Sequence, residues 1–107
     1  MPSKRQIQVA ETIAHLAADF FARESNRKSL ITVTRADISP DLKNALIFIT
    51  VIPDRFEQSA LNFAKRMRTE YREYLKSKSR LQHLPNIDFE IDYGEKNRQR
   101  IDDLTRS

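Results

Sequence analysis

The spacing of apolar residues predicts a helix followed by two strands in the first half of the chain. Residues 4–24 repeat apolar side chains every three or four positions, as one face of a helix does. Residues 30–38 are rich in β-branched side chains and partly alternate, which is typical of a strand. Residues 45–52 are apolar at both odd and even positions, which indicates a central strand covered at least partly on both sides. A turn signal at 39–41 predicts that the two strands form a hairpin.

The second half of the chain predicts a long helix and a last strand. Asp54 and Glu57 have the spacing of a capping box, and a helical pattern follows to about residue 78. Pro85 precedes a short segment that alternates apolar and acidic residues, and Gly94 ends it. The helix between the second and third strands favours a right-handed crossover and parallel pairing. We therefore expect an α+β fold, with a three-stranded mixed sheet and its helices on one face.

The chain has the length of one domain. It contains 107 residues, and no linker rich in Gly, Ser or Pro divides it. Residues 95–107 are highly charged, and their only apolar residues are Ile101 and Leu104. We interpret the adjacent acidic residues Asp102 and Asp103 as surface groups that aid solubility. We expect a domain over residues 1–94 and a charged tail over residues 95–107.

Positive charge is concentrated in one segment. The whole chain has a net charge of +4, whereas residues 65–80 hold seven Lys and Arg against two Glu, a net charge of +5. Such a segment indicates an anionic partner. The simpler alternative is a solvated helix face, which charge runs usually form.

The basic segment supplies the candidate binding residues. At 100° per residue, four of its cations form a basic stripe on the side opposite the apolar face, and three others extend that set. The stripe consists of Lys65, Arg68, Arg72 and Lys76. The same construction puts Tyr71 and Tyr74 with the core, which favours packing over base stacking. A second positive region is a further candidate, made of Lys4, Arg5, Arg27, Lys28 and Arg35. The seven candidate phosphate-binding residues are Lys65, Arg66, Arg68, Arg72, Lys76, Lys78 and Arg80.

Several classes of chemistry have little support in this sequence. The absence of cysteine excludes disulfides and thiolate sites, and a single glycine cannot build a phosphate-binding P-loop. His15 and His83 lie on different elements, and Asp41 has the position of a turn residue. No apolar run approaches the roughly 18–20 residues of a membrane span. We expect no catalytic residue, metal or cofactor, no membrane contact, and a location in the cytoplasm.

The segment at positions 31–51 resembles the bacterial ribosome-binding factor A family. That family reads as a "TVT-x-V-x-(V/I)-S-x-DL-x-x-A-x-(V/I)-(Y/F)-(V/I)-(S/T)" run. Similar spacing continues through Leu81, Pro85, Ile87, Phe89 and Asp92. The matching residues of the run are Thr32, Val33, Thr34, Ile38, Ser39, Asp41, Leu42, Ala45, Ile47, Phe48, Ile49 and Thr50.

This resemblance implies both a fold and a function. It implies a type II KH-like domain with the order α-β-β-α-α-β and without a GxxG loop. It also implies a non-catalytic assembly factor that binds the small (30S) ribosomal subunit and aids late maturation and processing of 16S rRNA. The implied partners are the small subunit, 16S rRNA and ribosomal proteins, and we expect a monomer.

One departure from the family pattern concerns the junction between the second and third helices. The family keeps an Ala-x-Gly kink there, whereas this chain has Met67, Arg68 and Thr69. The departure favours a straighter helix, with RNA contacted by side chains rather than clamped by backbone. Two other interpretations stay open, namely a protein-interaction module for an acidic partner and a generic nucleic-acid binder.

Overall fold

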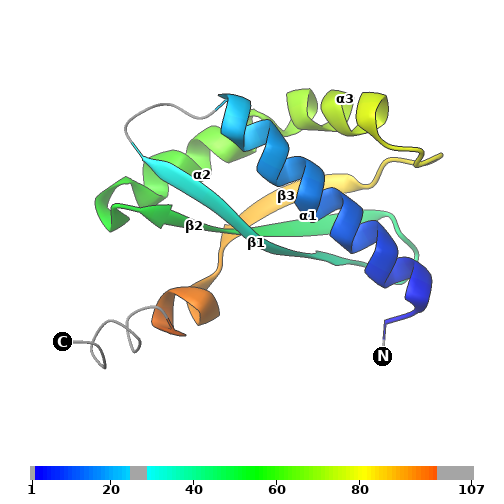
Figure 1. Cartoon of the computed structure of the whole chain (residues 1–107), viewed down its shortest axis with the longest axis horizontal. Coiled ribbons are helices and arrows are strands. Elements are labelled where there is room, and N and C mark those ends of the chain that lie inside the picture. The colour runs from blue at the N-terminus through cyan, green and yellow to red at the C-terminus, as the bar shows by residue number, and fades with distance from the viewer. Residues whose placement is uncertain (1, 25–28, 99–107) are drawn as a thin grey trace.

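The helices lie against a sheet in the computed structural model, which describes residues 2–24 and 29–98 (Figure 1). The helices are α1 (Lys4–Glu24), α2 (Glu57–Arg66) and α3 (Arg68–Lys78), and a short 3-10 helix, η1 (Asp54–Phe56), precedes α2. The strands are β1 (Leu30–Ile38), β2 (Asn44–Ile52) and β3 (Asn86–Ile91). Residues 93–98 are also helical. The predicted bounds of the first helix and of both hairpin strands are confirmed to within one residue.

The sheet has the predicted topology. Its order is β1-β2-β3, with β1 antiparallel to β2 and β2 parallel to β3. The central position of β2 explains why its residues are apolar on both faces of the strand. Ile47 and Ile49 are fully buried beneath the helices, while Leu46 and Phe48 are half-buried on the opposite face. The register of the hairpin shifts around Thr34, where β1 carries a bulge.

An aromatic cluster joins the helices to the sheet. Phe89 of β3 is fully buried, with its ring centroid 5.4 Å from Phe21 of α1 and 6.2 Å from Tyr71 of α3. The Tyr71 hydroxyl donates a 2.6 Å hydrogen bond to the Ile13 carbonyl, which satisfies a polar group that would otherwise be costly to bury. Burial raises the pKa of the Tyr71 phenol. The predicted core role of this tyrosine is confirmed.

The end of β3 is fastened by Asp92. Its buried carboxylate accepts a 2.6 Å hydrogen bond from the Thr34 hydroxyl and a 3.0 Å bond from the Glu95 N–H, which caps the helical residues 93–98. The Thr34 and Glu95 hydrogen bonds and the charge of Arg35 hold the pKa of Asp92 below its ordinary value, against the opposing effect of burial. The carboxylate thereby connects the bulge of β1 to the chain that leaves the sheet.

Asp54 and Glu57 do not form the predicted capping box. The N-terminal caps of η1 and α2 carry no side-chain hydrogen bond. Lys96 instead lies 2.9 Å from the Glu57 carboxylate and 3.6 Å from that of Asp54. The long-range ion pairs replace the local cap, and they hold the helical residues 93–98 against the start of α2. The expected boundary at residue 94 falls within this helical segment, and residues 99–107, with Asp102 and Asp103, lie outside the described part.

The prediction of a straighter helix through Met67 is wrong. Met67 has φ −89° and ψ 8°, so α2 ends at Arg66 and α3 begins at Arg68. Lys65 and Arg68, on the two sides of this break, lie 2.8 Å and 3.3 Å from the same Asp88 carboxylate oxygen. These tertiary contacts stabilise a break that local helix propensity does not predict.

Asp88 occupies the outer edge of β3. The Phe89 N–H donates a 2.8 Å hydrogen bond to the same carboxylate oxygen. Partial burial disfavours the charged form of Asp88. The hydrogen bonds from Lys65 and the Phe89 N–H, together with the charges of Lys65 and Arg68, outweigh that effect and hold the pKa of Asp88 below its ordinary value. One carboxylate therefore connects the α2–α3 junction to the sheet.

Replacing Asp88 with Asn is expected to lower the free energy of unfolding at neutral pH by between about 0.3 and 1 kcal/mol, because the ion pairs are partly exposed. Since folding lowers the pKa of Asp88, its stabilising effect is full above the unfolded pKa of about 4. That effect is lost as the pH falls through the folded pKa. Urea unfolding of both proteins from neutral to acidic pH measures the difference.

Glu90→Gln provides the matched control for this experiment. Glu90 is exposed on the same strand and forms no ion pair with a described residue. The control is expected to change stability little at any pH. A D88N protein as stable as the wild type at neutral pH would show that the carboxylate does not hold the junction.

Candidate nucleic-acid interface

The predicted basic stripe borders the apolar face of the helices rather than opposing it. The apolar arc is broad, because α3 buries Tyr71 and Leu75 and α2 buries Ala60 and Ala64. The side chains of Lys65 and Arg68 are 35% and 48% exposed and turn toward β3. The expected placement on the opposite side of the helix is therefore wrong for these residues.

Arg72 continues the same flank one turn further along α3. Its Nε donates a 3.1 Å hydrogen bond to the Pro85 carbonyl, and its Nη2 donates a 3.3 Å bond to the Leu84 carbonyl. The guanidinium satisfies carbonyls of the segment that leads into β3. Three of the seven candidate residues, Lys65, Arg68 and Arg72, are therefore bound to the protein's own acceptors.

The other four candidate residues are all exposed. The part of the chain that the structure describes offers none of them an ion pair. Arg66 lies in the last turn of α2, and Lys76 and Lys78 lie in the last turn of α3, where the helix dipole favours cations. Arg80 follows α3 directly. We call Arg66, Lys76, Lys78 and Arg80 the exposed basic set, and its charge is available to an anionic partner.

The second positive region of the sequence is divided by the fold. Arg5 lines a groove together with Arg80, so it adjoins the exposed basic set. Arg35 lies on the uncovered face of the sheet, with its guanidinium 3.8 Å from the ring centroid of Phe48. It also lies 2.7 Å from the carboxylate of Asp37. Lys4 is exposed at the start of α1, and residues 27 and 28 lie outside the described part.

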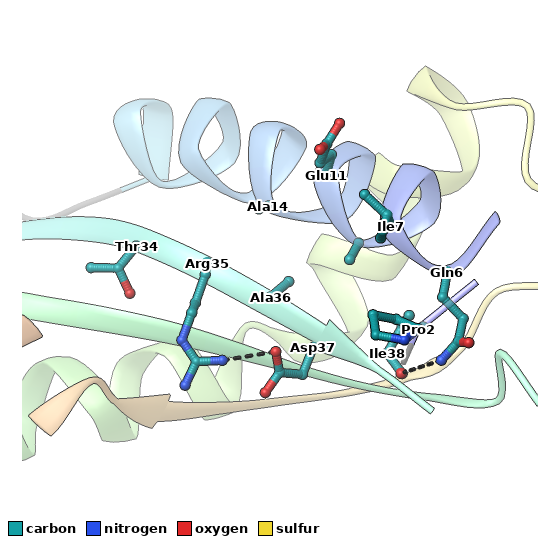
Figure 2. Close-up of a pocket in the computed structure, with 11 residues that line it drawn as sticks. Pro2, Gln6, Ile7, Glu11, Ala14, Thr34, Arg35, Ala36, Asp37 and Ile38 are labelled. Atoms are coloured by element: carbon teal, nitrogen blue, oxygen red, sulfur yellow. Dashed lines mark hydrogen bonds and ion pairs between the residues drawn. The ribbon is translucent and has the colours of Figure 1, made fainter. Parts of the chain in front are cut away.

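A groove of about 500 Å³ lies between α1 and β1 (Figure 2). Its lining is mostly apolar, with Ile7 and Ala36 among its residues, and it also includes Glu11, Arg35 and Asp37. Figure 2 shows the Arg35 guanidinium turned to Asp37 and away from α1. Because the Arg35 charge is paired with Asp37 and Glu11 is acidic, this mostly apolar groove is a poor match for a phosphate group.

The junction of α2 and α3 lacks the glycines of a backbone clamp. The only glycine of the chain, Gly94, follows β3. At the break, the Met67 N–H is directed to the carbonyls of Phe63 and Ala64, so it is used within the helix. Contact with a phosphate at this junction would therefore come from side chains.

The remaining candidate groups have structural surroundings. His15 lies 3.7 Å from Asp19 on the exposed face of α1, whereas His83 belongs to the segment before β3. The Asp41 carboxylate accepts hydrogen bonds from the Ser39 hydroxyl and the Lys43 N–H, and these bonds lower its pKa. Its predicted role in the turn is confirmed. Among residues 2–24 and 29–98, no three His, Asp or Glu side chains gather closely enough to hold a metal ion. No helix within those residues has the length and hydropathy to cross a membrane.

Curated relatives are similar over nearly the whole chain. The family model described as ribosome-binding factor A matches residues 5–105. A ribosome-binding factor A from Trichlorobacter lovleyi is 36% identical over 113 residues, which cover 99% of this chain and 89% of that protein. One from Ruegeria is 32% identical, over 98% of this chain and 82% of that protein.

Solved structures share the fold. The crystal structure of ribosome-binding factor A from Thermus thermophilus has a TM-score of 0.72 at 17% identity, over 80% of this chain and 94% of that one. A Thermus thermophilus homology model, fitted into the cryo-EM map of a 30S complex of that protein, has a TM-score of 0.62 at 22% identity. It covers 82% of this chain and 91% of its own. These structural neighbours have the KH-like α+β fold predicted from the sequence. Because the family model spans residues 5–105, this chain belongs to the ribosome-binding factor A family.

Proposed function

We propose that this protein binds the small ribosomal subunit and aids late maturation and processing of 16S rRNA. The observation that carries the proposal is the family match over residues 5–105. A structural neighbour from Thermus thermophilus was fitted into a map of its complex with 30S, which supports the same partner here. In this proposal the protein acts in the cytoplasm as a monomeric binding factor without catalysis, and it contacts rRNA and neighbouring ribosomal proteins.

The exposed basic set would supply the contacts to rRNA phosphates. Arg66, Lys76, Lys78 and Arg80 have no competing ion pair among the described residues, so an RNA phosphate need not displace an internal anion. Lys65, Arg68 and Arg72 instead hold the junction and the segment before β3. We propose that these three residues chiefly hold α2 and α3 in position against β3, and that the exposed Arg68 also contacts phosphate. This division leaves Arg68 and the exposed basic set as the residues proposed to contact phosphate, and it assigns Lys65 and Arg72 to internal contacts.

The chemistry of such an interface is electrostatic positioning. Contacts from Arg and Lys to phosphates orient a protein on RNA but carry no sequence information. Discrimination would come from the shape of the folded rRNA, because a helix and loop surface of fixed geometry matches only some arrangements of phosphates. Binding then favours those conformations of the particle that present the matching surface.

Sedimentation with ribosomal particles tests the proposed partner. The purified protein is expected to sediment with small subunits, and more with immature than with mature ones, and to be retained poorly by whole ribosomes. The reason is that an assembly factor recognises a surface that changes as the particle matures. Quantifying the protein in each pellet measures the preference.

Two results of that experiment would support other functions. Equal affinity for small subunits and for random RNA indicates a generic RNA-binding domain. An association with cell components that survives nuclease treatment indicates an interaction module that docks an acidic protein on the same cations.

Replacing Lys76 and Lys78 with Ala tests the residues. Each lost phosphate contact removes roughly 0.7–0.9 from the slope of log affinity against log salt concentration. The double variant is therefore expected to reduce the slope for small subunits by between about 1 and 2. Filter binding or fluorescence titration over a salt series measures it.

A control of equal charge distinguishes local contact from net charge. Arg23→Ala with Arg55→Ala also removes two cations, from exposed positions at the end of α1 and in η1. This control should leave the slope nearly unchanged. Equal slopes for the K76A/K78A protein and the wild type, with both proteins folded by thermal unfolding, would remove α3 from the interface.

A further inference from the structure

Two adjoining grooves lie at the end of the molecule where α1 begins, on the right of Figure 1. The larger groove has a volume of about 360 Å³ and lies between α1, the β1–β2 turn and the segment that joins α3 to β3. The smaller groove, of about 230 Å³, lies between α1 and the end of α3. Both are lined by Arg5, Val9 and Leu81, so they form one continuous surface feature, here called the end groove.

The end groove gathers basic side chains from segments far apart in the sequence. Arg5 comes from α1, Lys43 from the β1–β2 turn, and Arg80 and His83 from the segment after α3. All four side chains belong to residues at the surface, and none forms an ion pair with a residue that the structure describes. The fold, rather than any run in the sequence, brings these groups together.

One carboxylate lines the same groove. Asp41 accepts a 2.6 Å hydrogen bond from the Ser39 hydroxyl and a 3.0 Å bond from the Lys43 N–H, both on the same oxygen. This carboxylate is thus engaged by the turn that carries it. Three permanent cations, Arg5, Lys43 and Arg80, stand against this single anion, so the groove has a positive excess.

The walls of the end groove have a fixed geometry. Val9 in its floor is 6% exposed and belongs to the core. The turn that carries Lys43 is closed by hydrogen bonds from the Leu42 N–H to the Ser39 carbonyl and from the Asn44 N–H to the Ser39 hydroxyl. Leu42 has φ 62°, a left-handed conformation that costs energy for a leucine and that these bonds impose. The backbone that carries Lys43 is therefore held in place before any ligand binds.

We propose that the end groove binds the sugar-phosphate backbone of an rRNA strand in the small subunit. This proposal rests on the proposed function, and it adds Arg5, Lys43 and His83 to the residues that would contact RNA. Guanidinium groups such as those of Arg5 and Arg80 suit phosphate, because their planar donors form paired hydrogen bonds with its oxygens.

The lining of the groove favours backbone over bases. The described residues that line it include no Phe, Tyr or Trp on which a base would stack, and its floor is aliphatic. Gln8, Thr12 and Gln82 add neutral hydrogen-bonding groups suited to ribose hydroxyls. Arg80 belongs both to this groove and to the exposed basic set, so the two surfaces meet and would follow one continuous stretch of RNA.

The first test replaces Arg5 and Lys43 with Ala, leaving Arg80 and His83 in place. The variant is expected to reduce the salt slope for purified small subunits by between about 1 and 2, as two lost phosphate contacts require. The R23A/R55A protein again removes two cations elsewhere and is expected to keep the wild-type slope. Thermal unfolding checks that the R5A/K43A protein is folded.

The second test uses the absence of cysteine from this chain. A single cysteine at the groove, Gln82→Cys, carries an iron chelate that cleaves nearby RNA by hydroxyl radicals. The matched control is Ala18→Cys, on the exposed face of α1 beside Asp19. The groove probe is expected to cleave 16S rRNA at discrete positions several-fold more strongly than the α1 probe.

The outcomes separate this proposal from the proposed function. If the wild-type protein does not sediment with small subunits, both proposals fail. If it sediments but the R5A/K43A protein keeps the wild-type slope, the groove proposal alone fails. Cleavage from the groove probe no stronger than from the α1 probe would also overturn it, whatever the slope.

Discussion

The burial of Phe89 among the aromatic side chains of α1 and α3 fixes where the basic side chains of α3 lie. Its ring is 5.4 Å from Phe21 and 6.2 Å from Tyr71, so a strand and two helices meet at one point. Edge-to-face contacts of this kind allow few alternative orientations. Because Tyr71 faces this cluster, the orientation of α3 is fixed, and its basic side chains lie on the flanks of the helix. The distribution of surface charge is thus a consequence of the core.

The same strand that supplies the core aromatic also supplies an internal counter-ion. Side chains alternate along a strand, so Asp88 points away from the core because Phe89 points into it. At the edge of β3 it meets Lys65 and Arg68, and the carbonyls just before β3 meet Arg72. A cation with an internal acceptor gains less from a phosphate than one that otherwise faces only water. The exposed basic set, which has no such acceptor among residues 2–24 and 29–98, is accordingly the stronger basis for the proposed interface.

The sequence predicts the elements of this fold well because their patterns are local. The period of α1, the alternation of β3 and the apolar run of β2 each depend on which face of one element is buried. The break at Met67 is not predictable in this way, because Asp88 lies far along the chain and the local sequence favours a helix. The prediction of a capping box failed for a similar reason, since Lys96, which contacts both carboxylates, lies far along the chain from Asp54 and Glu57. For the candidate site, the sequence identifies which residues are basic, whereas the end groove depends on Lys43, an isolated cation in a turn.

The lack of a glycine loop changes the kind of RNA recognition that this domain can perform. A GxxG loop brings backbone N–H groups close to phosphates and holds a single strand, whereas here the α2–α3 junction is helical on both sides of Met67. In the mode of binding proposed here, recognition instead depends on cations that rigid elements hold in fixed positions, in the exposed basic set and in the end groove, which meet at Arg80. A flexible strand loses conformational entropy when it is held by both groups, whereas a folded rRNA surface of matching shape has already lost it. Fixed spacing between weak contacts thereby selects a particular folded RNA, although no single contact reads a base.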